Sequence, residues 1–343
     1  MNKKTIISVI IPTYNRAKYL PEALNSVLNQ KNHDYELDVI VIDDKSTDNT
    51  VEMLERDYKD KITLIKLPKN TGRPAMVRNA GMKVAKGEFI AFQDSDDVWA
   101  PRKFARQMQA FDDPNVVISY GNCDYITADG TVIDDRFAIN IPEPVQGYAF
   151  ARKVSKQPAP MPTPTVIIRR DVIDKIGVFN EKLVIATDTD YFIRVTTLGD
   201  VVYCNKVLVH MRRDGSNISS RPDESGDKAV YKHELNRITM FEHLHDELEL
   251  SEAEKAMLTY RIAELKLEVA ITARMLDRNI PVDINELKMP PKPNELKYID
   301  KTYGQKLVGP IKESLLWIFR SSPKHYVSTM VLFKRMVRNL RRS

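Results

Sequence analysis

The stretch IISVIIPTYNR, residues 6–16, joins a short apolar run to a polar turn that contains proline. Its first six residues are rich in β-branched side chains, so they predict a buried β-strand at Ile6–Ile11. A segment of helical period begins near Leu20, and a second β-rich run follows at Asp38–Ile42. A strand, a helix and a second strand in this order predict a parallel pair joined by a helical crossover.

The same alternation continues along the chain and predicts an α/β fold with a mostly parallel, twisted sheet flanked by helices. We expect a helix capped by Ser46 and another over Arg73–Ala85. The segment 121–165 has weak periodicity and several prolines, so it predicts loops with room for an edge strand. The remaining expected strands are Ile62–Leu67, Glu88–Phe92, Val116–Tyr120, Val166–Ile168 and Val201–Val209, and the remaining helices are Asp171–Ile176 and Asp188–Leu198.

Four regions are predicted from these patterns. Residues 1–222 are expected to form the α/β domain, 223–280 a helical extension, 281–304 a linker and 305–343 a basic amphipathic tail. The extension is expected to hold two long helices, and Ser251 with Glu254 makes a capping box at the start of the second. These helices could bury their apolar stripes within one chain or between the subunits of a homo-oligomer.

Composition excludes several classes of protein. The chain has 343 residues, of which 43% are hydrophobic and 29% charged, so it can form a core and is neither disordered nor fibrous. The run at Ile6–Ile11 is too short for a signal peptide, and no stretch approaches the length of a spanning helix. Two cysteines are too few for a disulfide framework. We therefore expect a cytoplasmic protein, with membrane contact only as a peripheral protein on the inner face of the cytoplasmic membrane.

Acidic residues follow the predicted strands at the positions where open parallel sheets bind ligands. Asp43 and Asp44 come after the second strand, and the fourth is followed by residues 93–97, QDSDD. No Gly-rich dinucleotide turn or phosphate-binding loop follows the first strand, which argues against hydride transfer and P-loop chemistry. Neighbouring carboxylates repel unless a cation lies between them, so the pattern favours Mg²⁺ or Mn²⁺ bound with a diphosphate. The alternative is a purely structural role, in which these residues cap helices and form turns.

These motifs in this order resemble the family 2 glycosyltransferases of GT-A fold, over a span from about Ile7 to about Ser219. The resemblance implies an inverting transfer of a sugar from a nucleotide diphosphate donor, with UDP the expected nucleotide. The matching segments are VIIPTYNR (9–16), VIDDKSTD (41–48), NTG (70–72), RNAG (78–81), FQDSDD (92–97), DTDYF (188–192) with Arg194, Arg212-Arg213, and NIS (217–219).

The resemblance also implies roles in binding the donor. Pro12 and Tyr14 would border the nucleoside together with Asn15, and Asp44 would hydrogen-bond the base edge. A second set of residues would contact the rest of the donor. In this set Arg78 would contact the base or a phosphate. Asp94 would contact the ribose and also bind the metal, and Asp96 would bind the metal on the diphosphate. Asp97 would support the turn. A salt bridge from Arg78 to a nearby aspartate is the structural alternative.

By the same resemblance Asp188 is the candidate general base for the acceptor hydroxyl. The family carries an acidic pair here, and this chain has Thr187 in place of the first acid. The alternative role of Asp188 is to cap its helix. Asp190 and Arg194, four residues apart on the same helix, predict a supporting ion pair.

Arg212 and Arg213 are candidates to neutralise the leaving diphosphate, and a solvated basic face is the alternative. The family often has a histidine two residues after this arginine, where this chain has Asp214. The third metal contact therefore stays open between Asp214 and the nearby His210, and His210 is the more plausible as an ordinary strand residue.

The basic excess of the chain lies in its tail. The whole sequence has 52 Lys and Arg and 47 Asp and Glu, whereas residues 305–343 hold nine Lys or Arg and one acid, so the rest is net acidic. A helix after Pro323 would carry an apolar stripe beside a basic face, which favours binding to an anionic membrane surface. Packing on the protein itself or on a second subunit is the alternative. A net acidic catalytic portion argues against nucleic acid.

The sequence thus predicts an enzyme that uses Mn²⁺ or Mg²⁺ to transfer a hexosyl or N-acetylhexosaminyl group to a hydroxyl of a glycan or lipid-linked acceptor. Synthesis of a bacterial surface polymer in the cell envelope is implied by the resemblance alone. The alternative is an inactive GT-A-like subunit that binds glycan or acts as a scaffold. Donor hydrolysis would distinguish the two.

Overall fold

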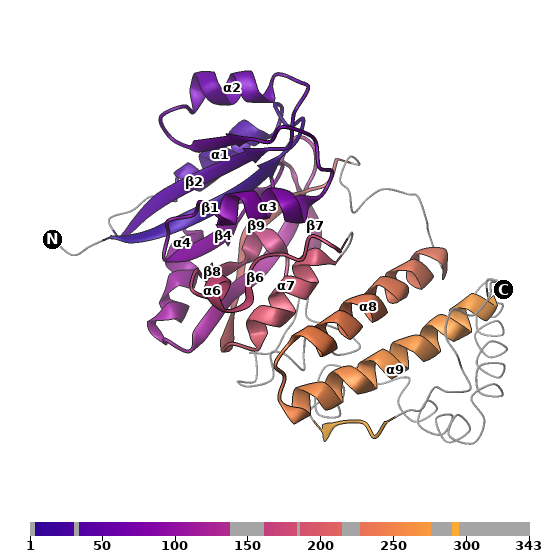
Figure 1. Cartoon of the computed structure of the whole chain (residues 1–343). Helices are drawn as coiled ribbons and strands as arrows, with labels where there is room; N and C mark the ends of the chain where they lie inside the picture. Colours follow the sequence, from indigo (N-terminus) through magenta and orange to yellow (C-terminus); the bar gives the residue numbers. More distant parts are fainter. Residues whose placement is uncertain are drawn as a thin grey trace. The chain divides into compact units, whose positions relative to one another are not determined.

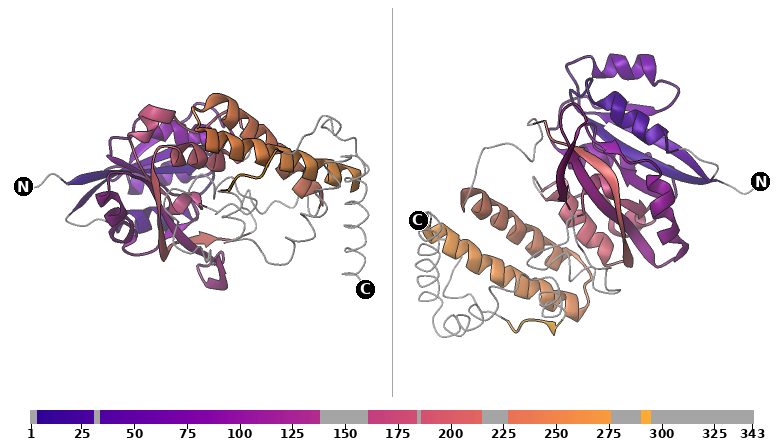
Figure 2. Two further views of the ribbon diagram at one scale, coloured as in Figure 1. Left: turned by 90° about the horizontal axis from the view of Figure 1, so that it is seen from below. Right: turned by 180° about the vertical axis from the view of Figure 1, so that it is seen from behind.

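The structure is a computed structural model in which residues 4–30, 34–137, 161–183, 186–214, 227–275 and 290–294 are described. The chain divides into two compact units, one of residues 1–149 and 159–220 and the other of residues 150–158 and 221–343. Figures 1 and 2 show the elements of each unit. The predicted segment 217–219, most of the linker and the basic tail lie outside the described residues, and the predicted domain boundaries stay predictions.

A nine-stranded sheet organises the described part of the first unit, in the order β3-β2-β1-β4-β8-β6-β9-β5 with β7 paired to β6. The strands β1, β2, β3, β4, β6 and β9 all run in one direction, because β8 pairs antiparallel with both β4 and β6. The prediction of a mostly parallel sheet is confirmed. The strands are β1 Thr5–Thr13, β2 Tyr35–Asp43, β3 Thr63–Lys66, β4 Phe89–Phe92, β5 Val98–Trp99, β6 Val116–Ile126, β7 Val132–Phe137, β8 Ile167–Arg169 and β9 Asp200–Arg212.

Helices cover both faces of this sheet, and the alternation of β1 shows why. Ile7, Val9 and Ile11 belong to one buried cluster with the apolar face of α1 (Leu20–Leu28). Ile10 points to the other face, where α3 (Pro74–Met82) lies against β1 and β2 (Figure 1). Gly81 permits this approach, since a Cβ there would stand 2.6 Å from Ile42 Cδ1.

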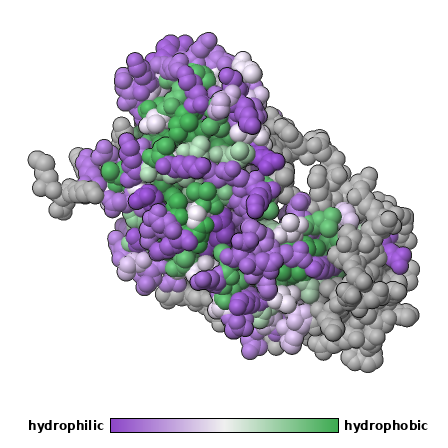
Figure 3. All heavy atoms as spheres, in the orientation of Figure 1, coloured by the Kyte–Doolittle hydropathy of each residue, from purple (hydrophilic) through white to green (hydrophobic). Residues whose placement is uncertain are grey.

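The other helices that the structure describes in the first unit are short. They are α2 Thr50–Asp57, α4 Lys103–Gln107, α6 Val172–Ile176 and α7 Thr187–Thr196, with 3-10 turns at Met108–Asp112 and Thr163–Thr165. In the space-filling view, hydrophilic residues surround a band of hydrophobic ones on the visible face (Figure 3). Beneath the surface, buried residues of β1 and β2 form one hydrophobic cluster with residues of α1, α2 and α4. The core therefore lies between the sheet and these helices, as the sequence pattern predicted.

The predicted elements recur within a few residues of their expected ends, with three exceptions. Ser46 does not cap α2, which begins four residues later at Thr50, where Asp48 Oδ1 accepts from the Thr50 backbone N–H at 3.0 Å. The Ser46 hydroxyl instead accepts a hydrogen bond from the Asn15 backbone N–H at 2.9 Å. The segment at Val98–Gln107 forms β5 and α4, which the weak periodicity there did not reveal. β6 continues to Ile126, six residues past its predicted end at Tyr120 and into the region 121–165 predicted as loops, because it pairs with β7, the edge strand for which that region left room, and with β9.

Two helices, α8 Asp227–Glu247 and α9 Glu252–Met275, pack together in the second unit (Figure 1). The predicted capping box is confirmed, since the Glu254 carboxylate accepts bonds from the Ser251 backbone N–H at 2.9 Å and from its hydroxyl at 2.7 Å. Among the described helices, none has the length and apolar character needed to cross a membrane.

Lys103 on α4 is fully buried, with its Nζ 2.8 Å from Gln107 Oε1 and 4.5 Å from the centre of the Trp99 ring. Burial lowers the pKa of this amine to about 7, because apolar surroundings disfavour the charged form. In the unfolded chain the amine has its ordinary pKa of about 10.4. Between about pH 7 and about pH 10 the unfolded chain therefore binds one more proton than the folded protein.

This difference predicts a pH-dependent stability. The contribution of Lys103 to the free energy of unfolding should rise by up to about 1.4 kcal/mol per pH unit across that window, and be constant below it. Urea denaturation at pH 7, 8 and 9 would give the free energy of unfolding of the protein and of Lys103→Met. The free energy of unfolding of the unchanged protein should rise with pH relative to that of the variant. The exposed Lys59 gives a matched control, because Lys59→Met should leave the pH slope unchanged. Parallel slopes for Lys103→Met would mean that the buried amine keeps its charge.

Candidate active site

The carboxyl ends of three adjacent parallel strands point to the same edge of the sheet, and β4 ends three residues before β1 in the register. Thr13 at the end of β1 is in register with Asp43 at the end of β2, and Ile10 is in register with Phe92 at the end of β4. The loops that follow these strands carry Tyr14, Asp44 and residues 93–97. These loops therefore emerge at one edge of the sheet, which is where ligands bind in open parallel sheets.

Asp44 is buried and held by the loop that follows β3. Its carboxylate accepts hydrogen bonds from the backbone N–H groups of Thr71 and Gly72 at 2.8 and 3.1 Å, and from the Thr71 hydroxyl at 3.1 Å. Gly72 has a φ of +60°, which glycine adopts without strain. The NTG motif thus orients the Asp44 carboxylate. The Asp44 backbone N–H donates to the Thr13 carbonyl at 2.8 Å, and the next residue of that strand end, Tyr14, is 43% exposed.

Asn15 joins the ends of β1 and β2. Its Oδ1 accepts from the backbone N–H of Thr47 at 2.7 Å, and its Nδ2 donates to the Thr47 hydroxyl at 3.2 Å. It has a φ of 52°, and Lys45 and Ala186 also have positive φ beside other predicted site residues. Such conformations cost free energy in non-glycine residues and concentrate at functional sites. The Asn15 side chain is thus engaged in fixing the loop.

Arg78 on α3 forms an ion pair with Asp94, with Nη2 2.8 Å from Oδ1. This is the structural alternative that the sequence left open for Arg78. The guanidinium is largely buried and lies 5.9 Å from the centre of the Phe179 ring. The Asp94 side chain remains about one-third exposed, so α3 positions a carboxylate that a ligand can still reach.

Asp96 and Asp97 share a crowded acidic turn. Burial, followed by the charge of Asp94, raises the pKa of Asp96. Burial, with the charges of Asp94 and Asp96, raises the pKa of Asp97 well above its ordinary value. Arg16 lies beside the turn, with its Nη2 3.6 Å from Asp96 Oδ2. The turn therefore concentrates negative charge that a further cation would stabilise.

This donor set fits a hard divalent ion. Mg²⁺ and Mn²⁺ prefer oxygen ligands and are commonly held by one or two carboxylates together with substrate phosphates. In the described parts of the chain no group of three or more His, Cys, Asp or Glu side chains is arranged to hold a metal by itself. Asp94 and Asp96 would therefore supply the protein ligands, and a diphosphate would complete the coordination.

Asp188 lies in the first turn of α7, one helical turn before Phe192. Its Oδ2 accepts a hydrogen bond from the Thr163 hydroxyl at 3.4 Å, and Ala186 rather than Asp188 occupies the N-cap position. Phe192 packs on Phe92, with ring centres 6.2 Å apart. Thr163 lies shortly before β8, whose Ile167 pairs antiparallel with Ala91 near the end of β4. The contact of Asp188 with Thr163 therefore places the start of α7 at the sheet edge where β4 ends.

Other contacts fix α7 to its surroundings. The predicted ion pair between Asp190 and Arg194 is confirmed at 3.0 Å, with the Asp190 side chain fully buried. Arg194 also donates to the backbone carbonyls of Ile176 and Val178 at 2.7 Å each. The Phe179 ring, which follows this loop, stacks on Tyr191 at 4.4 Å between ring centres.

The two adjacent arginines of β9 and its end have different surroundings. Arg212 is 2% exposed and bonded to groups of the protein, which argues against direct contact with a diphosphate. Arg213 is half-buried and lies 4.5 Å from the centre of the Tyr125 ring. His210 is in register with Val98, the residue after the acidic turn, and its Nδ1 is 2.5 Å from Asp124 Oδ1. The charge of Asp214 raises the pKa of Asp96. The third metal contact therefore stays open between His210 and Asp214.

Sequence reasoning gave no role to Arg16, Thr71 or Thr163. Arg16 and Thr71 stand inside the quoted motifs, so their positions beside Asp96 and Asp44 could have been suspected. Thr163 lies in the proline-bearing region, where no pattern points to Asp188. Its contact depends on the packing of the 3-10 turn at Thr163–Thr165 against the end of the sheet.

Comparison with known proteins agrees with this geometry. Residues 8–177 match the sequence profile of glycosyl transferase family 2. An uncharacterized glycosyltransferase of Rickettsia bellii is 34% identical over 177 residues, which are 52% of this chain and 24% of that protein. The poly(ribitol-phosphate) beta-N-acetylglucosaminyltransferase TarS of Staphylococcus aureus is 47% identical over 92 residues, 26% of this chain and 16% of TarS. The chain therefore spans a quarter or less of the length of these two relatives.

Two solved structures share the fold. The crystal structure of residues 1–349 of S. aureus TarS with UDP-GlcNAc aligns with a TM-score of 0.61 and 22% identity, covering 97% of this chain and 92% of that one. The mannosyltransferase PcManGT of Pyrobaculum calidifontis, in complex with GDP-Man and Mn²⁺, aligns with a TM-score of 0.53 and 16% identity, covering 97% and 88%. At this level of identity the likeness shows the fold alone, and it confirms the expected GT-A type.

Proposed function

Because residues 8–177 form a glycosyl transferase family 2 domain, we propose that this protein transfers a sugar from a nucleotide diphosphate donor to an acceptor hydroxyl with inversion. The observation that carries the proposal is the convergence of Asp44, Asp94 and Asp96 at one sheet edge, with the start of α7 at the same edge. A base, a donor site and an acidic turn at one edge are the parts that such a transfer needs.

The donor is proposed to be a UDP-sugar, with its base beside Tyr14 and Asp44. A rigid carboxylate can accept a hydrogen bond from the N–H of a pyrimidine edge, and an exposed aromatic ring can stack on the base. TarS, which has been crystallised with UDP-GlcNAc, supports an N-acetylhexosaminyl group as the first to test. Arg213 is the proposed cation for the diphosphate, since its neighbour Arg212 is buried.

Asp188 is proposed as the general base that removes the proton of the acceptor hydroxyl as the oxygen attacks the anomeric carbon. The bond to the diphosphate breaks on the opposite face, so the configuration inverts. Thr163 orients the carboxylate through one of its oxygens. A divalent ion held by Asp94 and Asp96 would neutralise charge on the diphosphate.

The acceptor is proposed to be a hydroxyl-rich surface polymer or its lipid-linked precursor. TarS, by its name, acts on poly(ribitol-phosphate), and this supports the same class of acceptor here. Within the chain we propose residues 1–222 as the catalytic domain and 223–280 as a helical extension.

A donor panel tests the proposed activity. The purified protein with Mn²⁺ should release nucleotide from one or a few sugar nucleotides, among them UDP-GlcNAc, UDP-glucose and GDP-mannose, and release should stop with a chelator. Release from UDP-sugars alone would support the assignment of Asp44 and Tyr14. Binding of a glycan without hydrolysis or transfer of any donor would instead favour an inactive scaffold.

The basic tail, residues 305–343, is proposed to bind an anionic membrane surface, where each Lys or Arg contributes about 1 kcal/mol. A variant truncated after Tyr303 should remain in the supernatant when sedimented with anionic liposomes, whereas the full chain should pellet. Donor hydrolysis should persist in the truncated protein. Neutral phosphatidylcholine liposomes are the control, since they lack the charge that the tail is expected to recognise. Equal sedimentation of the two proteins would contradict the proposal.

A further inference from the structure

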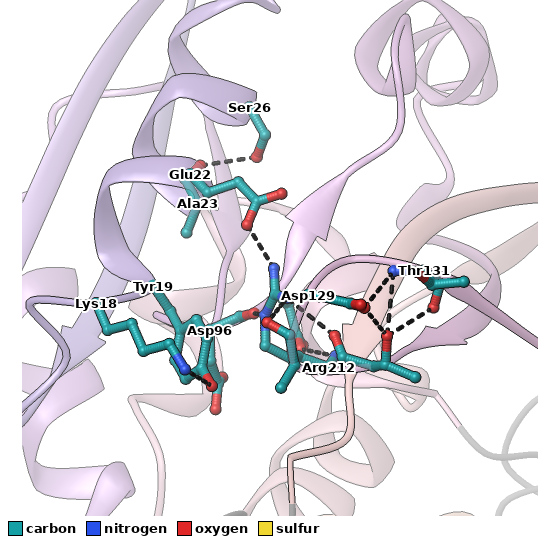
Figure 4. Close-up of polar contacts among 12 residues, drawn as sticks. Lys18, Tyr19, Glu22, Ala23, Ser26, Asp96, Asp129, Thr131 and Arg212 are labelled. Atoms are coloured by element: carbon teal, nitrogen blue, oxygen red, sulfur yellow. Dashed lines mark hydrogen bonds and ion pairs between the residues drawn. The ribbon is translucent and has the colours of Figure 1, made fainter.

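Arg212, the last residue of β9, holds together segments that are far apart in the sequence. Its Nε donates to the backbone carbonyl of Asp96 at 3.0 Å. Its Nη1 donates to the carbonyls of Thr127 and Ala128 at 3.0 Å each, and its Nη2 donates to the Glu22 carboxylate at 2.5 Å. Figure 4 shows this guanidinium between Glu22 of α1 and the acidic turn.

The backbone of Arg212 adds a second bond to the same turn. Its N–H donates to Asp97 Oδ1 at 2.9 Å. The side chain thus binds the carbonyl of Asp96 and the main chain binds the side chain of Asp97. These two bonds from one residue restrain the Asp96 carbonyl and the Asp97 carboxylate, on consecutive residues of the turn.

The ring of Tyr19 covers the guanidinium, with Cζ 4.8 Å from the ring centre. Arg212 is 2% exposed, so these bonds are shielded from water and are stronger than they would be at the surface. Glu22, by contrast, keeps a side chain that is 54% exposed.

We infer that Arg212 is a positioning residue, which fixes the turn so that the Asp96 carboxylate is held in place for the metal and the donor diphosphate. This inference rests on the proposed function and adds to it a residue that contacts neither ligand. Only arginine can fill this position, because its planar fork presents five donors in fixed directions, whereas lysine offers a single ammonium group.

The test measures metal-dependent binding rather than activity. Calorimetry of UDP with and without Mn²⁺ would compare the unchanged protein with Arg212→Lys and Glu22→Gln. For Arg212→Lys we expect the Kd with Mn²⁺ to rise about tenfold or more while the Kd without metal stays within about twofold, because the nucleoside contacts are untouched. Glu22→Gln should give a smaller change in the same direction, and its exposed side chain keeps the test independent of folding.

Glu55→Gln is the matched control, since it breaks an exposed ion pair with Lys66 away from the turn. It should change neither Kd. If Arg212→Lys lost binding equally with and without Mn²⁺, or if neither Arg212→Lys nor Glu22→Gln lost any binding, the positioning role of Arg212 would be overturned. Either result would leave the proposed function standing. Failure of the unchanged protein to bind UDP with Mn²⁺ would overturn the proposed function together with the inference.

Discussion

Replacing Asp188 by asparagine should lower kcat for sugar transfer by about 10²–10⁴-fold, the range that general-base catalysis contributes. The amide cannot accept the proton of the acceptor hydroxyl, but it has nearly the same shape and can still accept a bond from Thr163. The Kd for the donor should stay within about threefold, because the base acts mainly in the transition state. Steady-state transfer assays and calorimetry on the same preparation would measure both quantities.

Asp174 offers a matched control for this variant. It lies in the first turn of α6, as Asp188 lies in the first turn of α7, and it is exposed. Asp174→Asn removes the same favourable charge near a helix N-terminus and should leave kcat unchanged. If Asp188→Asn transferred sugar at the rate of this control, Asp188 would not be the base. A lower melting temperature together with lost donor binding would indicate a structural role instead.

Replacing Asp96 by alanine should remove the dependence of donor binding on Mn²⁺. The unchanged protein is expected to bind a UDP-sugar at least about tenfold more tightly with the metal, which corresponds to about 1.4 kcal/mol. In Asp96→Ala the affinity with Mn²⁺ should fall to that measured with a chelator. Calorimetric titrations with the ion and with the chelator give the two affinities directly.

The stability of the variant separates this prediction from simple unfolding. Burial and the charge of Asp94 raise the pKa of Asp96, so this carboxylate is under electrostatic stress in the folded protein. Removal of the Asp96 carboxylate should therefore not lower the melting temperature, whereas removal of a carboxylate that stabilises the fold would lower it. Asp60→Ala, at an exposed position, should preserve the response to Mn²⁺. An unchanged metal dependence in Asp96→Ala would exclude Asp96 as a metal ligand.

Most of the sheet could be predicted because its signals are local. The runs at Ile6–Ile11 and Glu88–Phe92 are short, apolar and β-branched or aromatic, and each is flanked by turn or helix signals. The two-residue strand Val98–Trp99 escaped prediction, since so short a run has no periodicity to detect. The start of α2 was misplaced because Ser46 and Asp48 are both good capping residues, and in the fold Asp48 bonds the Thr50 backbone N–H while Ser46 bonds Asn15.

The sequence predicted which residues belong to the candidate site, but it did not predict the hydrogen bonds and ion pairs between them. The order of strands and helices is enough to place Asp44 and Asp94 after two parallel strands, β2 and β4, which lie on either side of β1. The ion pair of Arg78 with Asp94 could be named only as an alternative, because its choice of partner depends on how α3 packs on the sheet. The contact of Thr163 with Asp188 joins residues 25 positions apart through a region with no pattern.

The sequence by itself determined the α/β sheet, the family and the acidic strand ends, because each of these follows from periodicity and motif within short stretches of chain. Only the tertiary structure separated Arg212 from Arg213. The two residues are neighbours with the same charge, and in the sequence they were equal candidates for the diphosphate. In the fold Arg212 is buried and paired with Glu22, 190 positions away, while Arg213 remains half-buried. The burial and partners of a side chain come from distant segments, and so the role of each arginine depends on the folded chain.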